Sequence, residues 1–104
     1  PTYYPDLAMA LALLIDKNTT GTVHVANSGY CSWHEFAEAI FDESKMDVKV
    51  KPVSSAQWGA PARRPANSRL DCSRYAGIAG KPMRHWREAL KDFLREQGAV
   101  TDNI

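Results

Sequence analysis

The sequence predicts a small α/β lobe that contains a right-handed βαβ unit with two parallel strands, three main helices, a short extra strand pair and a long irregular Arg/Pro loop. Three features of the sequence lead to this fold class. Three segments repeat apolar residues at helical spacing, two short runs are rich in β-branched residues, and a long stretch of Pro, Gly and Arg precedes the last helix. A strand, a helix and a second strand within roughly 30 residues form a parallel, right-handed unit.

The composition is that of an ordinary globular domain with almost no net charge. The 104 residues carry 13 Lys and Arg against 12 Asp and Glu, a formal charge of +1, and 44% are hydrophobic. We expect one domain over residues 1–98, a frayed tail at 99–104, and no long-range field that would attract nucleic acid or an anionic membrane. The apolar run 7–15 is too short to span a bilayer, and a signal-peptide pattern is missing, which predicts a cytoplasmic protein. The two cysteines fit free thiols in a reducing compartment.

The first part of the chain predicts a helix followed by a strand. Pro5 and Asp6 open a helix that runs to about Lys17, because proline fits the first turn of a helix and an acidic residue favours its positive end. Apolar residues recur through this segment at helical spacing. The β-branched run 22–26 (TVHVA) is closed by turn residues at 27–29, so it predicts a short strand.

The second helix and the second strand follow directly. Ser32 and Glu35 form an S-x-x-E capping box, which predicts that a helix starts there. Trp33 lies on the apolar face of this helix and is predicted to be buried, as is Trp86 on the last helix. Residues 47–53 (DVKVKPV) alternate valine with lysine and contain a proline, the pattern of a half-exposed edge strand.

The rest of the chain predicts a loop, a short helical turn and a final helix. Residues 54–68 (SSAQWGAPARRPANS) show no sustained apolar period, which predicts a long irregular loop. A helical turn over 72–76 follows, and an amphipathic helix runs from about 84 to 97. The extra strand pair would join residues 2–4 to residues 68–70, which ties the start of the chain to the end of the loop.

The Arg/Pro loop holds the candidate binding residues. Arg63 and Arg64 are flanked by prolines and present forked donors from a restricted backbone, an arrangement that suits phosphate or carboxylate oxygens. Asn67 and Ser68 add neutral hydrogen-bonding groups. The alternative is that both arginines are simply solvated or pair with acidic neighbours. Trp58, in the same loop, fits either stacking on a base or sugar or plain packing against the protein.

Other kinds of chemistry are disfavoured by the sequence. Cys31 and His34 stand together at a helix start, but a nucleophile and base pair needs a third orienting group, and none is evident. The histidines and cysteines lack the ligand-pair spacing of a zinc site, so we predict neither a metal site nor a catalytic residue. No G-x-x-G-x-x-G, G-x-x-x-x-G-K or Y-x-x-x-K motif occurs, so the chain lacks a dinucleotide fingerprint of its own.

Four sequence blocks, taken in order, resemble one enzyme family. The blocks PTYYPDLAMALALLI, GTVHVANSGYCSWHEFAEAIFD, PARRPANSRLDCSRY and PMRHWREALKDFL extend from residue 1 to about residue 94. They closely resemble the C-terminal part of the dTDP-4-dehydrorhamnose reductases, which are extended short-chain dehydrogenases/reductases. The clearest signature is R-P-x-x-S, here Arg64, Pro65 and Ser68.

This resemblance implies the substrate-binding domain of an NADPH-dependent oxidoreductase that reduces a 4-keto deoxysugar linked to thymidine diphosphate, in dTDP-L-rhamnose biosynthesis. Hydride transfer would depend on an N-terminal Rossmann half that bears the glycine fingerprint and the Tyr/Lys acid-base pair and binds the NADPH. We therefore expect no cofactor on these 104 residues and no activity from them alone.

The resemblance also implies a set of substrate-binding residues. They are Arg63, Arg64, Asn67, Ser68, Trp58 and Tyr3. The two arginines would lie near the diphosphate or at the closing interface, and the asparagine and serine would position the loop. The tryptophan or the tyrosine would meet the base or the sugar.

The expected partners are the dTDP-sugar and the Rossmann half, with neither nucleic acid nor a membrane. A lobe of this kind normally rests one face on the Rossmann half. We therefore expect an exposed apolar patch on the isolated lobe, through which copies self-associate. An alternative function stays open, a non-catalytic regulatory or interaction module of the same family.

Overall fold

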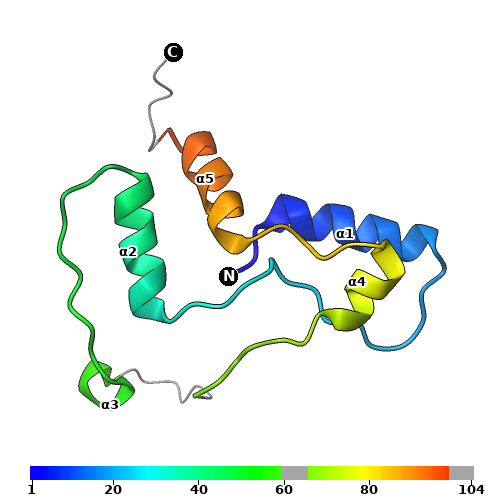
Figure 1. The fold of residues 1–104 in the computed structure, drawn as a ribbon, viewed down its shortest axis with the longest axis horizontal. Helices are drawn as coiled ribbons and strands as arrows, with labels where there is room; N and C mark the ends of the chain where they lie inside the picture. Colours follow the sequence, from blue (N-terminus) through cyan, green and yellow to red (C-terminus); the bar gives the residue numbers. More distant parts are fainter. Residues whose placement is uncertain (60–65, 99–104) are drawn as a thin grey trace.

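The structure is a computed structural model that describes residues 1–59 and 66–98, and Figure 1 shows its fold. The expected frayed tail at 99–104 lies outside the described residues. In the described part the chain forms five helices, which are α1 (Tyr4–Asp16), α2 (Trp33–Glu43), α3 (Ser55–Trp58), α4 (Ser73–Ala79) and α5 (Trp86–Glu96). The three main helices of the sequence analysis correspond to α1, α2 and α5.

The molecule is flat and spread out. It measures 46 × 44 × 19 Å, and its Cα radius of gyration is 16.2 Å. A compact domain of about 100 residues has a radius of gyration near 13 Å. The apolar residues accordingly form two small clusters in place of one central core.

The first cluster lies between α2 and α5, and the second lies between α1 and α4, at the other end of the molecule (Figure 1). The buried members of the first are Ala39, Trp86, Leu90 and Leu94. The buried members of the second are Ala10, Leu14 and Tyr75. Each cluster is small, so the segments that join them have a large part in holding the fold together.

Two helices begin at capping boxes. In α2 the Ser32 hydroxyl accepts from the backbone N–H of Glu35, and the Glu35 carboxylate accepts from the backbone N–H of Ser32, each at 3.0 Å, which confirms the predicted start of this helix. The short helix α3 was not predicted. Its start uses the same device, because Ser54 and Gln57 exchange hydrogen bonds of 2.9 and 3.2 Å.

The two predicted strands are not seen in the described part of the chain. Residues 22–26 and 47–53 are assigned no strand, and an isolated parallel bridge joins Ser28 to His85. A strand forms only against a partner, and Figure 1 shows 22–26 crossing the middle of the molecule while 47–53 follows its edge beyond α2. The βαβ unit is therefore not seen among these residues, and it stays a prediction.

The two tryptophans that were predicted to be buried have different outcomes. Trp86 is 7% exposed, at the centre of the α2–α5 cluster, as predicted. The prediction for Trp33 is wrong, because its side chain is 85% exposed. Trp33 is the first residue of α2, so it lies at the N-terminal end of the helix. Its ring meets the ring of Phe36 edge-on, with 6.3 Å between the ring centres.

Helix α1 presents a wide apolar surface to solvent. Its exposed apolar side chains are Tyr4, Met9, Leu11 and Ile15. The spacing of Tyr4, Leu11 and Ile15 places these three on one face, so part of the apolar pattern that predicted α1 is not covered by the described residues. No helix in residues 1–59 and 66–98 is long and apolar enough to cross a membrane.

Candidate functional site

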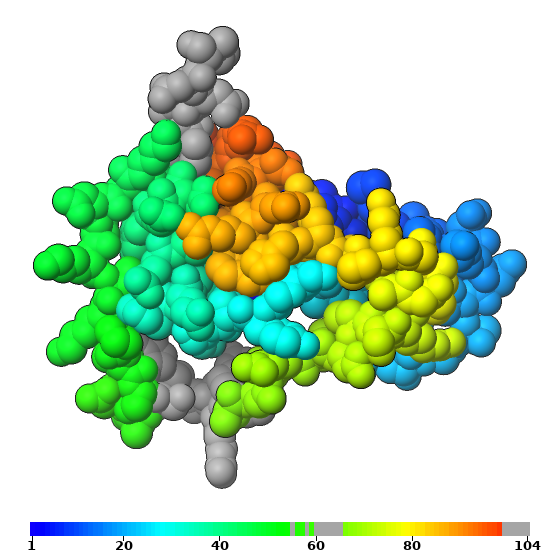
Figure 2. Space-filling model, in the orientation of Figure 1, coloured from blue at the N-terminus to red at the C-terminus, as the bar shows by residue number. Residues whose placement is uncertain are grey.

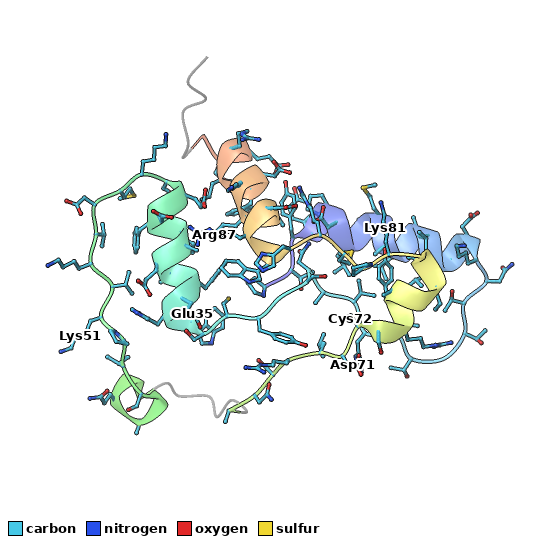
Figure 3. All side chains as sticks on the ribbon, viewed as in Figure 1. Glu35, Lys51, Asp71, Cys72, Lys81 and Arg87 are labelled. Carbon is cyan, nitrogen blue, oxygen red and sulfur yellow. The ribbon has the colours of Figure 1, made fainter. Side chains whose placement is uncertain are left out.

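A hollow of about 280 Å³ lies in the middle of the molecule, between the start of the chain and two loops. One loop contributes residues 26–31 and the other contributes Ser68, Arg69, Leu70 and Cys72, while Pro1 and Thr2 close one side. In Figure 2 the opening lies between the cyan atoms of the first loop and the yellow-green atoms of the second. Figure 3 shows Cys72 beside Asp71, just before α4. The hollow thus joins segments that are far apart in sequence.

Asn27 anchors the first loop. It is 5% exposed, and its side chain makes three hydrogen bonds. The Oδ1 atom accepts from the backbone N–H of Tyr3 at 2.7 Å, and Nδ2 donates to the Asp6 carboxylate at 2.8 Å and to the Arg84 carbonyl at 3.2 Å. One amide therefore joins the start of α1, the hollow and the segment that leads to α5.

The next two residues lie against the start of α5. The Ser28 N–H donates to the Arg84 carbonyl at 2.9 Å, and the Ser28 carbonyl accepts from the Trp86 N–H at 3.0 Å. Gly29 has a φ of +86°, and a Cβ atom built there would stand 2.4 Å from Nε2 of His85. Only glycine fits both the backbone angle and this close approach. This wall of the hollow is therefore fixed.

An ion-pair network supports the anchor from behind. Nε and Nη2 of Arg84 donate to the two carboxylate oxygens of Asp6 at 2.8 and 3.1 Å, and Nη1 donates to Asp92 on α5. The hydrogen bond from Arg84 holds the pKa of Asp6 below its usual value, and the hydrogen bond from Asn27 acts in the same direction. The network joins α1 to α5 and so holds the two clusters of the fold together.

The second loop forms the opposite wall of the hollow. Asn67 makes an Asx turn, since its Oδ1 accepts from the backbone N–H of Arg69 at 3.0 Å. The Arg69 guanidinium lies over the ring of Tyr30 on the first loop, 4.6 Å from the ring centre. Asp71 accepts from the backbone N–H of Ser73 at 3.0 Å, at the start of α4. The pair formed by Arg69 and Tyr30 connects the two walls.

The structure brings part of the predicted set to the hollow. Ser68 lines it, and Asn67 shapes the turn directly before it. Residues 2–4 and 68–70 were predicted to pair as strands. They form no ladder, since Tyr4 already belongs to α1, but Thr2 and Ser68 line the same hollow.

The other predicted site residues lie elsewhere or outside the described part. Arg63 and Arg64 fall outside the described residues. Trp58 is the last residue of α3, and its side chain is likewise not described. Tyr3 is 9% exposed, and its ring meets Phe93 edge-on at 6.3 Å. A hydrogen bond to Glu96 and burial raise the pKa of Tyr3 to about 12. Tyr3 therefore lies against α5, and its predicted contact with the base or the sugar stays a prediction.

Sequence reasoning missed three residues of this site. Asn27 was read as a turn residue, and its role depends on partners that are 21 to 57 positions away along the chain. Tyr30 and Arg69 were assigned no role in binding. For Arg69 the sequence did hold a signal, because this residue directly follows Asn67 and Ser68, which were already predicted to bind a ligand.

The structure gives no support to a nucleophile at Cys31. Burial raises the pKa of the Cys31 thiol, whereas a nucleophilic cysteine needs a lowered one. His34 pairs with Glu38 at 2.8 Å. Within residues 1–59 and 66–98, no cluster of three or more histidine, cysteine or acidic side chains could hold a metal ion.

Comparisons with known proteins identify the family. The family model of the RmlD substrate binding domain matches residues 1–98. The spore coat polysaccharide biosynthesis protein SpsK of Bacillus subtilis is 43% identical over 102 residues, which cover 98% of this chain and 35% of that protein. A dTDP-4-dehydrorhamnose reductase of Mycobacterium tuberculosis is 46% identical over 96 residues, which cover 90% of this chain and 32% of that protein.

Solved structures give the same result. The dTDP-4-dehydrorhamnose reductase of Bacillus anthracis, crystallised in complex with NADP, superposes with a TM-score of 0.84 at 41% identity, over 92% of this chain and 34% of that chain. A reductase of the same name from Clostridium acetobutylicum gives a TM-score of 0.86 at 34% identity, over 94% of this chain and 35% of that chain. The chain spans about a third of the length of these relatives. With a family model matched over nearly its whole length, this chain belongs to the RmlD substrate binding domain family.

Proposed function

We propose that this chain is the substrate-binding part of an NADPH-dependent dTDP-4-dehydrorhamnose reductase and that it holds the dTDP-linked sugar at the hollow between residues 26–31 and 68–72. The observation that carries the proposal is the family match over residues 1–98, together with relatives that are named as this reductase. These names also favour a reductase over a non-catalytic module of the same family. With two reduced cysteines, we assign the protein to the cytoplasm.

The chemistry of the hollow supports this assignment. Its lining combines an arginine, a serine and an exposed tyrosine ring with the backbone of two loops. A guanidinium and hydroxyl groups suit phosphate oxygens, and an exposed ring suits a base or a sugar face. The buried amide of Asn27 and the glycine at position 29 fix one wall before any ligand arrives, which lowers the entropy lost on binding.

We assign the binding and orientation of the dTDP-sugar to this chain, and the reduction of the sugar to the rest of the reductase. The crystallised relative carries NADP, and the reduced form of this cofactor, NADPH, would supply the hydride. The described residues contain no glycine-rich turn between a strand and a helix that could hold a dinucleotide, so none of them is assigned to that cofactor. Arg63 and Arg64 keep their proposed place near the diphosphate or at the closing interface, and Asn67 and Ser68 are still proposed to position the loop. Trp58 or Tyr3 is still proposed to meet the base or the sugar.

We also place the exposed face of α1 against the remaining two-thirds of the reductase. Ile15 is 76% exposed and Tyr4 is 69% exposed, on a helix whose other side is buried in the α1–α4 cluster. Contiguous apolar surface of this kind is typical of an interface. In the isolated chain the same face is available to a second copy.

Isothermal titration calorimetry tests the proposal on the chain itself. The chain is titrated with dTDP, with ADP as a diphosphate that carries another base, and with NADPH. We expect binding of dTDP in the millimolar range or tighter, weaker binding of ADP, and no binding of NADPH. Binding of NADPH in preference to dTDP, or turnover of a keto-sugar by these 104 residues with added NADPH, would contradict the proposal.

A further inference from the structure

One arginine of the described region differs from the other four in the hydrogen bonds that its side chain makes. Four of them donate hydrogen bonds to acceptors of the protein, and these are Arg74, Arg84, Arg87 and Arg95. The fifth, Arg69, has no hydrogen bond or ion pair from its guanidinium to any residue of 1–59 or 66–98. Its contact in this region is the one with the ring of Tyr30. Among these residues nothing occupies the N–H donors of this side chain, so they can reach a ligand.

The position of Arg69 is nevertheless defined. Its backbone N–H is bound by Asn67 at 3.0 Å, and its guanidinium lies 4.6 Å from the centre of the Tyr30 ring. Arg69 and Tyr30 both line the hollow. A cation on a ring face keeps its hydrogen-bond donors free, because the attraction involves the face of the guanidinium and the electrons of the ring.

The hollow has a positive charge and no carboxylate to balance it. Its lining contains no aspartate or glutamate among the residues that the structure describes. The nearby Asp71 is engaged by the backbone of Ser73 at the start of α4, and the hydrogen bonds from Ser73 hold the pKa of its carboxyl below the usual value. An anionic ligand would therefore meet a cation that has no competing partner in the lining.

We propose that Arg69, oriented by the ring of Tyr30, contacts the diphosphate of the nucleotide-sugar bound in this hollow. The inference rests on the proposed function and adds a binding residue that the family signature R-P-x-x-S does not include. The planar guanidinium matches two phosphate oxygens at once, which an ammonium group cannot do. Because Tyr30 already holds the side chain, less rotamer freedom is lost when the ligand binds.

Affinity measurements on matched variants test the proposal. The unaltered chain, Arg69→Ala, Arg69→Lys, Tyr30→Phe and Tyr30→Leu are each titrated with dTDP and with thymidine, which lacks the phosphates. The control is Lys81→Ala, which removes one positive charge at a site that Figure 3 shows beside α1, away from Cys72 at the hollow. Circular dichroism confirms that each variant is folded.

We expect Arg69→Ala to weaken dTDP binding about tenfold, which corresponds to about 1.4 kcal/mol, and to leave thymidine binding unchanged. Arg69→Lys should recover part of the loss. Tyr30→Phe should bind dTDP as the unaltered chain does, and Tyr30→Leu should bind it more weakly. Lys81→Ala should have no effect.

Three results would overturn the inference, and they differ in what they mean for the proposed function. Equal dTDP affinity for Arg69→Ala and the unaltered chain would overturn the role of Arg69 and leave the proposed function standing. Equal losses for dTDP and thymidine would show a structural role, with the same consequence. Absence of dTDP binding by the unaltered chain would overturn both.

Discussion

Replacing Asn27 by alanine should destabilise the fold far more than its place in a turn suggests. The side chain is 5% exposed, and its removal eliminates hydrogen bonds of 2.7, 2.8 and 3.2 Å. The N–H of Tyr3 would be left in a buried position without its acceptor. At about 1 kcal/mol for each of the three hydrogen bonds, the expected loss is at least about 3 kcal/mol, and the unpaired N–H of Tyr3 adds to it.

Such a loss is large for a domain of this size. Small domains have free energies of unfolding of about 5–15 kcal/mol, and a loss of about 3 kcal/mol lowers the melting temperature of a 100-residue domain by about 12–24 °C. Urea denaturation followed by circular dichroism at pH 7 measures the change. Asn67→Ala is the matched control, because that side chain makes one exposed hydrogen bond with the described residues, at 3.0 Å, and its removal should cost less than about 1 kcal/mol.

The comparison of these two asparagines tests whether the buried side chain of Asn27 anchors the first loop of the hollow. If Asn27→Ala and Asn67→Ala lower the free energy of unfolding by the same amount, the claim that one buried amide joins α1, the hollow and the approach to α5 is refuted. A large loss for Asn27→Ala alone supports it. The same variant should also bind dTDP less tightly, because residues 26–31 lose their attachment.

Three further predictions concern the backbone, the pH dependence and the surface of α1. Gly29→Ala should cost more than Gly80→Ala in thermal melts, because both positions have a φ near +85° but only the first brings a Cβ against a neighbouring side chain; equal costs would argue against the close contact. The pKa of Asp6 is lowered in the folded state, so its contribution is complete above the unfolded value of about 3.9 and is lost as the pH falls through the folded value. The stability gap between the protein and Asp6→Asn should therefore shrink from pH 6 to pH 3, and a constant gap would contradict this. Ile15→Lys should leave the melting temperature within about 4 °C and reduce self-association in light scattering, whereas a clean monomer of the unaltered chain at high concentration would count against the exposed interface.

The sequence predicted the helices well where the information is local. The capping box of Ser32 and Glu35 and the apolar stripe of α5 depend on residues three or four positions apart, so they can be read from the chain alone. The start of α3 at Ser54 and Gln57 uses the same type of motif and was missed, because the prolines and glycine that follow it gave the segment the composition of a loop.

The strands and most of the site depend on partners that local patterns do not reveal. A valine run predicts the ability to form a strand, but 47–53 has no neighbour to pair with among the described residues, and Val53 is 51% exposed. The helical spacing of the apolar residues in α1 was correctly found, but one of its apolar faces is left exposed by the described residues. The pairing of Arg69 with Tyr30 joins two loops that are 39 positions apart, and only the folded chain brings them together.

The most direct test of the account maps where a nucleotide diphosphate binds. The chain, labelled with nitrogen-15, is titrated with dTDP while its backbone amide signals are followed by NMR. We predict that the largest shifts fall on residues 26–31 and 67–72, with smaller changes at the starts of α2 and α4, which directly follow these segments. Shifts concentrated on the exposed face of α1, or no shifts at millimolar dTDP, would contradict the claim that this hollow receives the nucleotide-sugar.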